Sequence, residues 1–201
     1  MVTPNDRKNQ SFPRLLFSLA VYVVGASLVI GGFLVLLWVG RPYAALYLSG
    51  KKAHLEELVR TGEVEGDRLV IPAVLVDAKL VEGATIENLR DGVAHVSGSA
   101  QPGAPGNAIV KGHNYAQFGG DDAFFSLLHL VRNGSPIYLY KDGRKFQYKV
   151  VGKTVRDVKS PRLYESSESE RLTLITCASD LSSLSMVSPT KRIIVTARPV
   201  K

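Results

Sequence analysis

The chain has 201 residues, and its 25 lysines and arginines against 18 aspartates and glutamates give a formal net charge of +7. A hydrophobic content of 45% excludes a disordered chain, and the length allows one domain with an appendage. The positive charge suits anionic lipids or wall polymers. Because the basic residues are scattered instead of clustered, we predict no nucleic-acid partner.

The apolar residues are concentrated near the N-terminus, where residues 15–39 form an uncharged stretch. As a helix with about 1.5 Å per residue, this stretch would span roughly 37 Å, enough to cross a hydrocarbon core of about 30 Å. The alternative is a secretory signal peptide, whose apolar region usually has about 7–15 residues. This stretch is longer, and no small-residue cleavage site follows it before Arg41. We therefore predict a membrane anchor.

The charges that flank the anchor predict its orientation. Arg7, Lys8 and Arg14 precede it, whereas Arg41 is the only charged residue that follows it closely. The positive-inside rule then puts the N-terminus in the cytoplasm and the rest of the chain outside. A stripe of apolar residues predicts a juxtamembrane helix at residues 43–60, ended by Gly62. The predicted parts are a cytoplasmic tail (1–14), the anchor (15–39), a stalk or helix (40–68) and a folded domain (69–201).

The folded domain has the pattern of a β-rich protein, with short apolar runs separated by turn residues. Asp142-Gly143 predicts a hairpin and Asn133-Gly134 another turn. Helical spacing of apolar residues predicts one helix at residues 122–132, capped by Asp121 or Asp122. The polar segment 160–171 is predicted to be a mobile loop. The predicted strands are residues 69–76, 94–96, 108–111, 137–141, 145–151, 172–177 and 193–197. This number of short strands predicts a closed β-barrel or a sandwich.

Cys177 is the only cysteine, so it has no partner for an intramolecular disulfide, and no C-x-x-C metal motif is present. It comes last in a predicted strand, and a strand end is a rigid platform with an open side. A small buried thiol that packs like alanine is an equally good interpretation of this residue on its own. If the strands before and after it pair in antiparallel fashion, Arg192 lies close to Cys177 and could stabilise an oxyanion there. Its neighbour Lys191 competes for the same role.

Four histidines are candidates for an acid/base partner. His95 lies within a predicted strand, whereas His113 follows the end of one, and we favour His113 for that reason. His54 lies among charged residues of the juxtamembrane helix, and His129 lies between leucines of the predicted helix. A free histidine titrates at about pH 6.5 and a free cysteine at about 8.5, so a Cys–His pair needs little tuning to work near neutral pH.

Three segments together resemble the signature segments of the sortase family, in the order that the family has them. They are GNAIVKGHN (106–114), TLITC (173–177) and RIIV (192–195). Residues 71–83, 89–92 and 102–103 extend the resemblance, which covers about residues 69–201. The N-terminal anchor also matches the usual arrangement in this family. The resemblance does not assign a sortase class.

The resemblance implies a mostly β fold, a closed eight-stranded β-barrel with one or two short helices. It also implies Cys177 as the nucleophile, His113 as the acid/base and Arg192 as the oxyanion-stabilising cation. Thr176 matches threonines that help to hold the substrate backbone. The sequence has a basic pair at the arginine position, and we choose Arg192 because the following Ile-Ile-Val fits the family register better.

The reaction that the resemblance implies is transpeptidation. A secreted protein with an LPxTG-like C-terminal sorting signal is cleaved, and its acyl group passes through a thioester to an amine of a cell-wall precursor or a pilin lysine, as in pilus assembly. Hydrolysis is expected where no amine is present. A cysteine peptidase and a membrane-tethered binding barrel are the alternatives.

No cofactor and no metal are predicted. Some sortases bind calcium near the loop that precedes the TLxTC strand, and Glu165, Glu168 and Glu170 occupy that loop here. Glutamates among serines are more typical of a solvated loop, so the calcium interpretation is not adopted.

Overall fold

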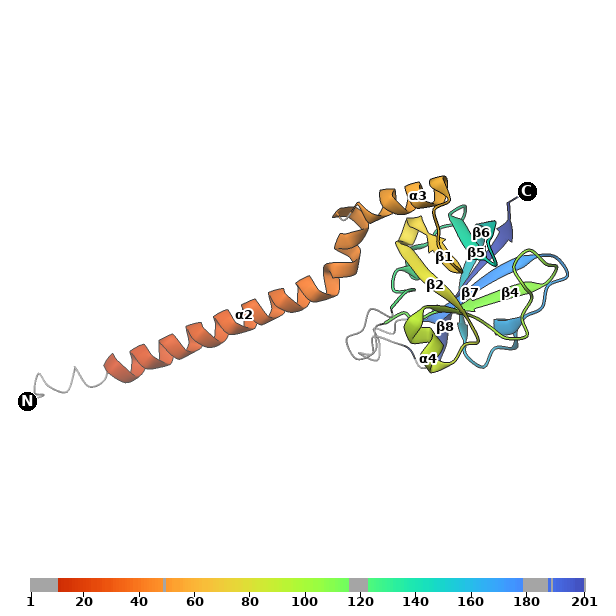
Figure 1. The fold of residues 1–201 in the computed structure, drawn as a ribbon. Coiled ribbons are helices and arrows are strands. Elements are labelled where there is room, and N and C mark those ends of the chain that lie inside the picture. The colour runs from red at the N-terminus through yellow and green to blue at the C-terminus, as the bar shows by residue number, and fades with distance from the viewer. Residues whose placement is uncertain (1–10, 49, 116–122, 179–187, 189, 201) are drawn as a thin grey trace, which may run out of the picture. The chain divides into compact units, whose positions relative to one another are not determined.

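The computed structural model describes residues 11–48, 50–115, 123–178, 188 and 190–200 (Figure 1). The chain divides into two compact units, Met1–Ala44 and Ala45–Lys201. Helix α2 (Ser11–Leu48) provides all the described residues of the first unit. The second unit contains a short helix and a β-barrel.

Helix α2 is long and apolar enough to cross a membrane. Its segment Leu16–Trp38 has 23 residues and a mean hydropathy of 2.4, and none of its most apolar window is buried in the protein. Such a continuous apolar surface is stable in lipid, where the helix satisfies all of its own backbone hydrogen bonds. The helix extends beyond the predicted anchor (15–39), through Arg41 and Pro42 to Leu48.

The predicted juxtamembrane helix 43–60 is wrong as a single element. The chain breaks at Gly50, which has a φ of 63°, and helix α3 (Lys51–Thr61) follows. The helix ends at Gly62 as predicted. Gly62 has a φ of 74°, a left-handed backbone conformation that glycine adopts readily. Leu55 and Val59 of α3 are buried against the barrel residues Val70 and Tyr140. Helix α3 is therefore a packed part of the second unit.

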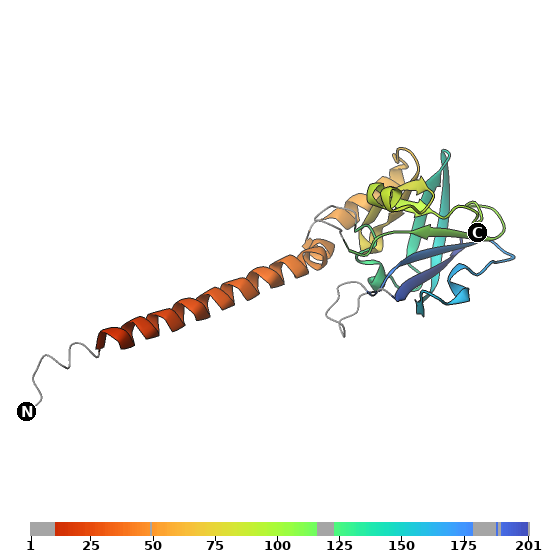
Figure 2. The ribbon, with the colours of Figure 1, turned by 90° about the horizontal axis from the view of Figure 1, so that it is seen from below.

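Eight strands form a closed barrel in the order β1-β2-β3-β4-β7-β8-β6-β5, which confirms the expected fold class (Figures 1 and 2). The strands β2 and β3, and likewise β4 and β7, pair in parallel, and the other neighbours are antiparallel. The bounds are β1 (Arg68–Ile71), β2 (Val76–Glu82), β3 (Val93–His95), β4 (Asn107–Lys111), β5 (Pro136–Lys141), β6 (Arg144–Asp157), β7 (Arg171–Cys177) and β8 (Lys191–Pro199). Alternate side chains along each strand fill the apolar interior.

Two sequence predictions about the strands have opposite outcomes. The hairpin at Asp142-Gly143 is confirmed, because both residues have positive φ and join β5 directly to β6. The single strand at 69–76 is wrong. Pro72–Val74 forms the 3₁₀ turn η1 and Leu75 has a φ of 56°, so the chain reverses and the unpredicted β2 pairs with β1.

The helices of the barrel unit also differ from the prediction. Residues 124–127 form turns, followed only by the 3₁₀ turn η2 (Leu128–Leu130), so the helix at 122–132 is wrong. Asp121 and Asp122, its predicted caps, lie outside the described residues. Helix α4 (Ile86–Asp91) was not predicted; its N-terminus is capped by the Thr85 hydroxyl, which accepts from the Asn88 N–H. The polar segment 160–171 contains the 3₁₀ turn η3 (Pro161–Tyr164).

Replacing Leu55 with alanine tests the packing of α3. Leu55 is 0% exposed, so Leu55→Ala removes buried methyl groups and leaves a cavity that lowers the free energy of unfolding by about 2–5 kcal/mol. We expect a drop of about 5–10 °C in the melting temperature of the barrel. The exposed neighbour His54 supplies the control, since His54→Ala should leave the melting temperature unchanged. An equal melting temperature for both variants would contradict the packing of α3 on the barrel.

Candidate active site

Cys177 ends β7 and lies directly opposite Arg192 of β8 in the antiparallel pair that the sequence suggested. Leu174 and its partner Val195 fill the barrel core, and side chains alternate along a strand. Ile175 and Cys177 therefore lie on the outer face of the barrel. The Cys177 side chain is half-buried and its thiol is free.

The same register separates the two basic residues that compete at the start of β8. Arg192 pairs with Cys177 and so shares its outer face, whereas Lys191 pairs with Asp157 of β6 and its side chain points to the other face. The Arg192 guanidinium donates to the carbonyl of Ser188 at 3.2 Å and to that of Lys191 at 2.9 Å. These contacts hold the guanidinium at the strand end.

His113 comes to this strand end through the parallel pairing of β4 with β7. Lys111 pairs with Ile175, and the Gly112 N–H donates to the Ile175 carbonyl at 3.2 Å. The chain beyond β4 therefore continues beside the last residues of β7. The Nε2 atom of His113 is buried and has no hydrogen-bond partner among the described residues. A ring nitrogen without a structural partner is available to exchange a proton with a substrate.

The backbone that carries His113 is held from three sides. The Thr176 hydroxyl donates to the Gly112 carbonyl at 2.8 Å, and the Phe125 N–H donates to the His113 carbonyl at 2.9 Å. A Cβ atom on Gly112 would lie 2.7 Å from Cδ2 of Phe125, so only glycine fits this position. The side chain of Thr176 is buried and inward, on the face opposite Cys177. Its predicted contact with substrate stays a prediction, and what the hydroxyl does here is position the end of β4.

The rival histidine His95 is a structural residue. It is 1% exposed and pairs with the core residue Val110, so its ring points into the barrel and away from the face of Cys177. Its Nδ1 lies 3.0 Å from Oε2 of Glu82, and its Nε2 lies 2.9 Å from the carbonyl of Ala100. Partial burial would raise the pKa of Glu82, but hydrogen bonds from Lys141 and His95 hold the pKa below its usual value. Glu82 therefore remains a charged acceptor for both.

The other two histidines belong to elements that do not pair with β7. His54 is exposed on helix α3. His129 lies in η2 with its Nδ1 3.0 Å from the Ser126 carbonyl, and burial lowers the pKa of its ring.

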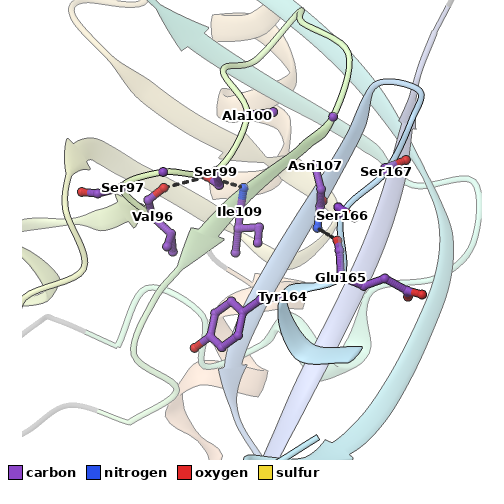
Figure 3. Close-up of a pocket in the computed structure, with 12 residues that line it drawn as sticks. Val96, Ser97, Ser99, Ala100, Asn107, Ile109, Tyr164, Glu165, Ser166 and Ser167 are labelled. Carbon is purple, nitrogen blue, oxygen red and sulfur yellow. Dashed lines mark hydrogen bonds between the residues drawn. The ribbon is translucent and has the colours of Figure 1, made fainter. Parts of the chain in front are cut away.

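A cavity of about 410 Å³ opens on the outer face, between the β3–β4 loop and the segment that joins β6 to β7 (Figure 3). Ile109 of β4 and Tyr164 of η3 line it. Ile109 also belongs to a buried cluster with Leu163, Ile175 and Ile194. Because Ile175 precedes Cys177 by two residues on the same face, the cluster reaches to within about 7 Å of the cysteine along the strand. The cavity and Cys177 therefore lie on the same outer face, with the level of Ile109 and its partner Thr173 roughly 13 Å from Cys177 along β7.

Buried polar contacts hold both walls of the cavity. The amide of Asn107 donates to the Glu165 carbonyl at 2.8 Å (Figure 3). It also accepts from the Thr173 hydroxyl at 2.7 Å. The hydroxyl of Tyr148 donates to the Glu170 carboxylate at 2.7 Å, and burial, reinforced by this carboxylate, raises the pKa of Tyr148. Tyr148 therefore stays protonated and remains a donor.

The Glu170 carboxylate is thus engaged by protein groups. Besides Tyr148, it accepts from the N–H of Gly103 at 3.0 Å, which ties the β3–β4 loop to the start of β7. Within the part of the chain that the structure describes, no three histidine, cysteine, aspartate or glutamate side chains gather as a metal-binding group. The glutamates weighed above as calcium ligands do not form such a group.

The end of β7 thus brings a thiol and a guanidinium to one face, with the backbone of His113 beside them and a cavity farther along the same face. A thiol with an acid/base partner can attack a carbonyl and form a thioester, and a cation can stabilise the oxyanion that forms. Sequence reasoning had named all three residues as candidates, but it had missed the cavity and the contact of Thr176 with Gly112. Neither has a sequence signal, since both depend on pairing between distant strands.

Comparison with known proteins agrees with this arrangement. The sequence model of the sortase domain matches residues 69–200. Sortase A of Bacillus anthracis is 30% identical over 112 residues, which are 56% of this chain and 51% of that protein, so the chain spans about half the length of this relative.

Solved structures show the same fold. Sortase C-1 of Actinomyces oris superposes with a TM-score of 0.59 at 24% identity, over 75% of this chain and 81% of that one. Sortase A of Listeria monocytogenes gives a TM-score of 0.58 at 23% identity, over 67% of this chain and 86% of that one. These similarities support the fold and do not separate the two sortase classes. Because the sortase-domain match covers well over half of the chain, the protein belongs to the sortase family.

Proposed function

We propose that this protein is a membrane-anchored cysteine transpeptidase that cleaves an LPxTG-like C-terminal sorting signal and transfers the acyl group to an amine. The observation that carries the proposal is the register of β7: Cys177 faces Arg192 across one strand pair, and His113 follows the end of the strand on the other side. Family membership supports the same activity.

The proposed first step is acyl transfer to the enzyme. The Cys177 thiolate, whose proton His113 holds as an imidazolium, attacks the threonine carbonyl of the sorting signal. The Arg192 guanidinium stabilises the negative oxygen of the tetrahedral intermediate. The C–N bond to glycine then breaks, and His113 donates a proton to the departing amine. The products are a thioester on Cys177 and the released C-terminal fragment.

The second step transfers the acyl group to an acceptor. An amine of a cell-wall precursor or a pilin lysine attacks the thioester, His113 takes up the proton of the amine, and the Cys177 thiolate leaves. Where no amine is present, water resolves the thioester more slowly. The cavity on the face of Cys177 can hold the acyl part of the substrate through both steps, because that part stays attached while the leaving group is exchanged for the acceptor.

The apolar helix supports a matching location. We propose that residues 15–39 anchor the protein in the cell membrane with residues 1–14 in the cytoplasm, and that the catalytic domain 69–201 faces outward. Substrates would then arrive as secreted proteins that are still held at the membrane by their own C-terminal segments.

The transpeptidase reaction is tested with a fluorescent sorting-signal peptide, with and without an amine acceptor, and mass spectrometry of the products. We expect the amine conjugate as the main product of the wild type, and no cleavage by Cys177→Ala. Cleavage by Cys177→Ala would refute the assignment of the nucleophile. Hydrolysed product alone, even in excess amine, would identify a cysteine peptidase, and an intact peptide together with an unreactive thiol would identify a binding module.

The role of Arg192 is tested against its neighbour Lys191. Loss of a cation that stabilises the oxyanion lowers kcat by about 10²–10³-fold, so we expect this decrease for Arg192→Ala. Lys191→Ala removes the same charge from the other face of β8 and should change kcat less than about threefold. Equal losses in the two variants would mean that the cation acts only through the general charge of the region.

Thr176→Val tests whether the Thr176 hydroxyl positions His113. Valine keeps the shape but leaves the buried Gly112 carbonyl without its donor, which costs about 1–3 kcal/mol of stability. We expect a lower melting temperature and a reduced kcat with little change in KM. The control Thr176→Ser keeps the hydroxyl and should restore most of the activity. A change in KM alone would instead support a direct contact with substrate.

A further inference from the structure

Lys111 is a cation on the surface that carries Cys177. It ends β4 and pairs with Ile175, two residues before Cys177 on the same outer face. With about 4.8 Å between strands and about 6.6 Å for two residues along a strand, its Cα atom lies roughly 8 Å from that of Cys177. An extended lysine side chain reaches about 6 Å, so its ammonium can approach a substrate bound at the cysteine.

The Lys111 ammonium is held over this surface by an aromatic ring. Its Nζ lies 4.7 Å from the centroid of the Tyr164 ring, a cation–π contact that joins the end of β4 to η3. The Lys111 side chain is half-buried, and none of the ion pairs between described residues includes it. A partly desolvated ammonium with no carboxylate beside it attracts an anionic ligand group.

The position of the cavity shows which part of a substrate passes Lys111. Ile109 and Tyr164 line the cavity, and Lys111 follows Ile109 by two residues on the same face. Lys111 therefore lies between the cavity and the level of Cys177. The acyl part of the substrate stays bound to the enzyme through the thioester stage, so it needs a binding site of its own. If the cavity is that site, the chain between the cavity and Cys177 runs past Lys111.

We propose that Lys111 makes the enzyme select sorting signals with an acidic residue directly before the threonine whose carbonyl is attacked. This inference rests on the proposed function. In an LPxTG-like signal that residue, x, is the only position of the acyl part that the signal leaves open. An extended peptide advances about 3.3 Å per residue, so the x side chain lies within reach of the Lys111 ammonium. Arg192 adds positive charge on the same face and disfavours a basic x.

The test uses the full-length protein in detergent and three peptides that differ only in Glu, Gln or Lys at x. A partly exposed ion pair supports about a five- to tenfold preference, so we expect kcat/KM for Glu to exceed that for Lys by about this factor, with Gln between them. Because the preference is electrostatic, it should shrink as the salt concentration rises.

Variants of Lys111 separate its charge from its packing. The quantity compared is the ratio of kcat/KM for the peptide with Glu at x to kcat/KM for the peptide with Lys at x. Lys111→Met keeps the apolar stem and should bring this ratio close to one. Lys111→Glu should invert the ratio, and Lys111→Arg should preserve it. Lys149→Met removes an exposed cation of β6 and should leave the ratio as in the wild type. Melting temperatures identify any variant that has lost its fold. In that case Lys111→Arg and the salt series still decide whether the charge of Lys111 selects the residue at x.

The outcomes for this inference and for the proposed function differ. If Lys111→Met keeps the wild-type ratio, or if the wild type cleaves the three peptides equally well, Lys111 does not select the substrate, while Cys177-dependent cleavage still supports the transpeptidase. If the wild type cleaves none of the peptides, or if cleavage survives Cys177→Ala, the proposed function fails and the inference about Lys111 fails with it.

Discussion

The position of β7 between two strands of opposite direction is the constraint on which the site depends. The parallel pairing with β4 brings the residues after Lys111 to the end of β7, and the antiparallel pairing with β8 brings the first residues of β8 to the same place. A slip of one residue in either pair would turn every side chain of that strand to the other face. Core burial prevents this, because Leu172 and Leu174 are fully buried and their partners in β8 also fill the interior. The hydrophobic core thus fixes the arrangement of the polar groups outside it.

Buried polar contacts add to this register where the core ends. Asn107 uses its amide in two directions, accepting from Thr173 of β7 and donating to the backbone of the β6–β7 segment. At the other end of β4, Thr176 of β7 holds the Gly112 carbonyl. A buried polar group that lost its partner would be strongly unfavourable, so each contact permits only one alignment of β4 with β7. The cavity wall and the His113 backbone are therefore positioned by the same strand pair.

The sequence predicted those elements correctly whose signal lies in a short stretch of neighbouring residues. The long uncharged stretch predicted the apolar helix, and Asp142-Gly143 predicted the hairpin. The strand at 69–76 was wrong because its reversal depends on Leu75, an apolar residue in a left-handed conformation that no turn rule indicates. The helix at 122–132 was wrong because Phe125, Leu128 and Val131 fill the core of the barrel, which produces helical spacing without a helix. The sequence favoured His113 over His95 by its place after a strand and by the family resemblance. The parallel pairing of β4 with β7, a long-range contact that spacing alone does not reveal, adds a spatial reason for the same choice.

The register also places two arginines side by side. Arg156 of β6 pairs with Arg192 of β8, so their side chains share the outer face. In the proposed reaction the attacked carbonyl oxygen becomes negative next to Arg192, and Arg156 supplies a second positive charge on the same face. Charge stabilisation that grows only as the transition state forms lowers the barrier without tightening substrate binding.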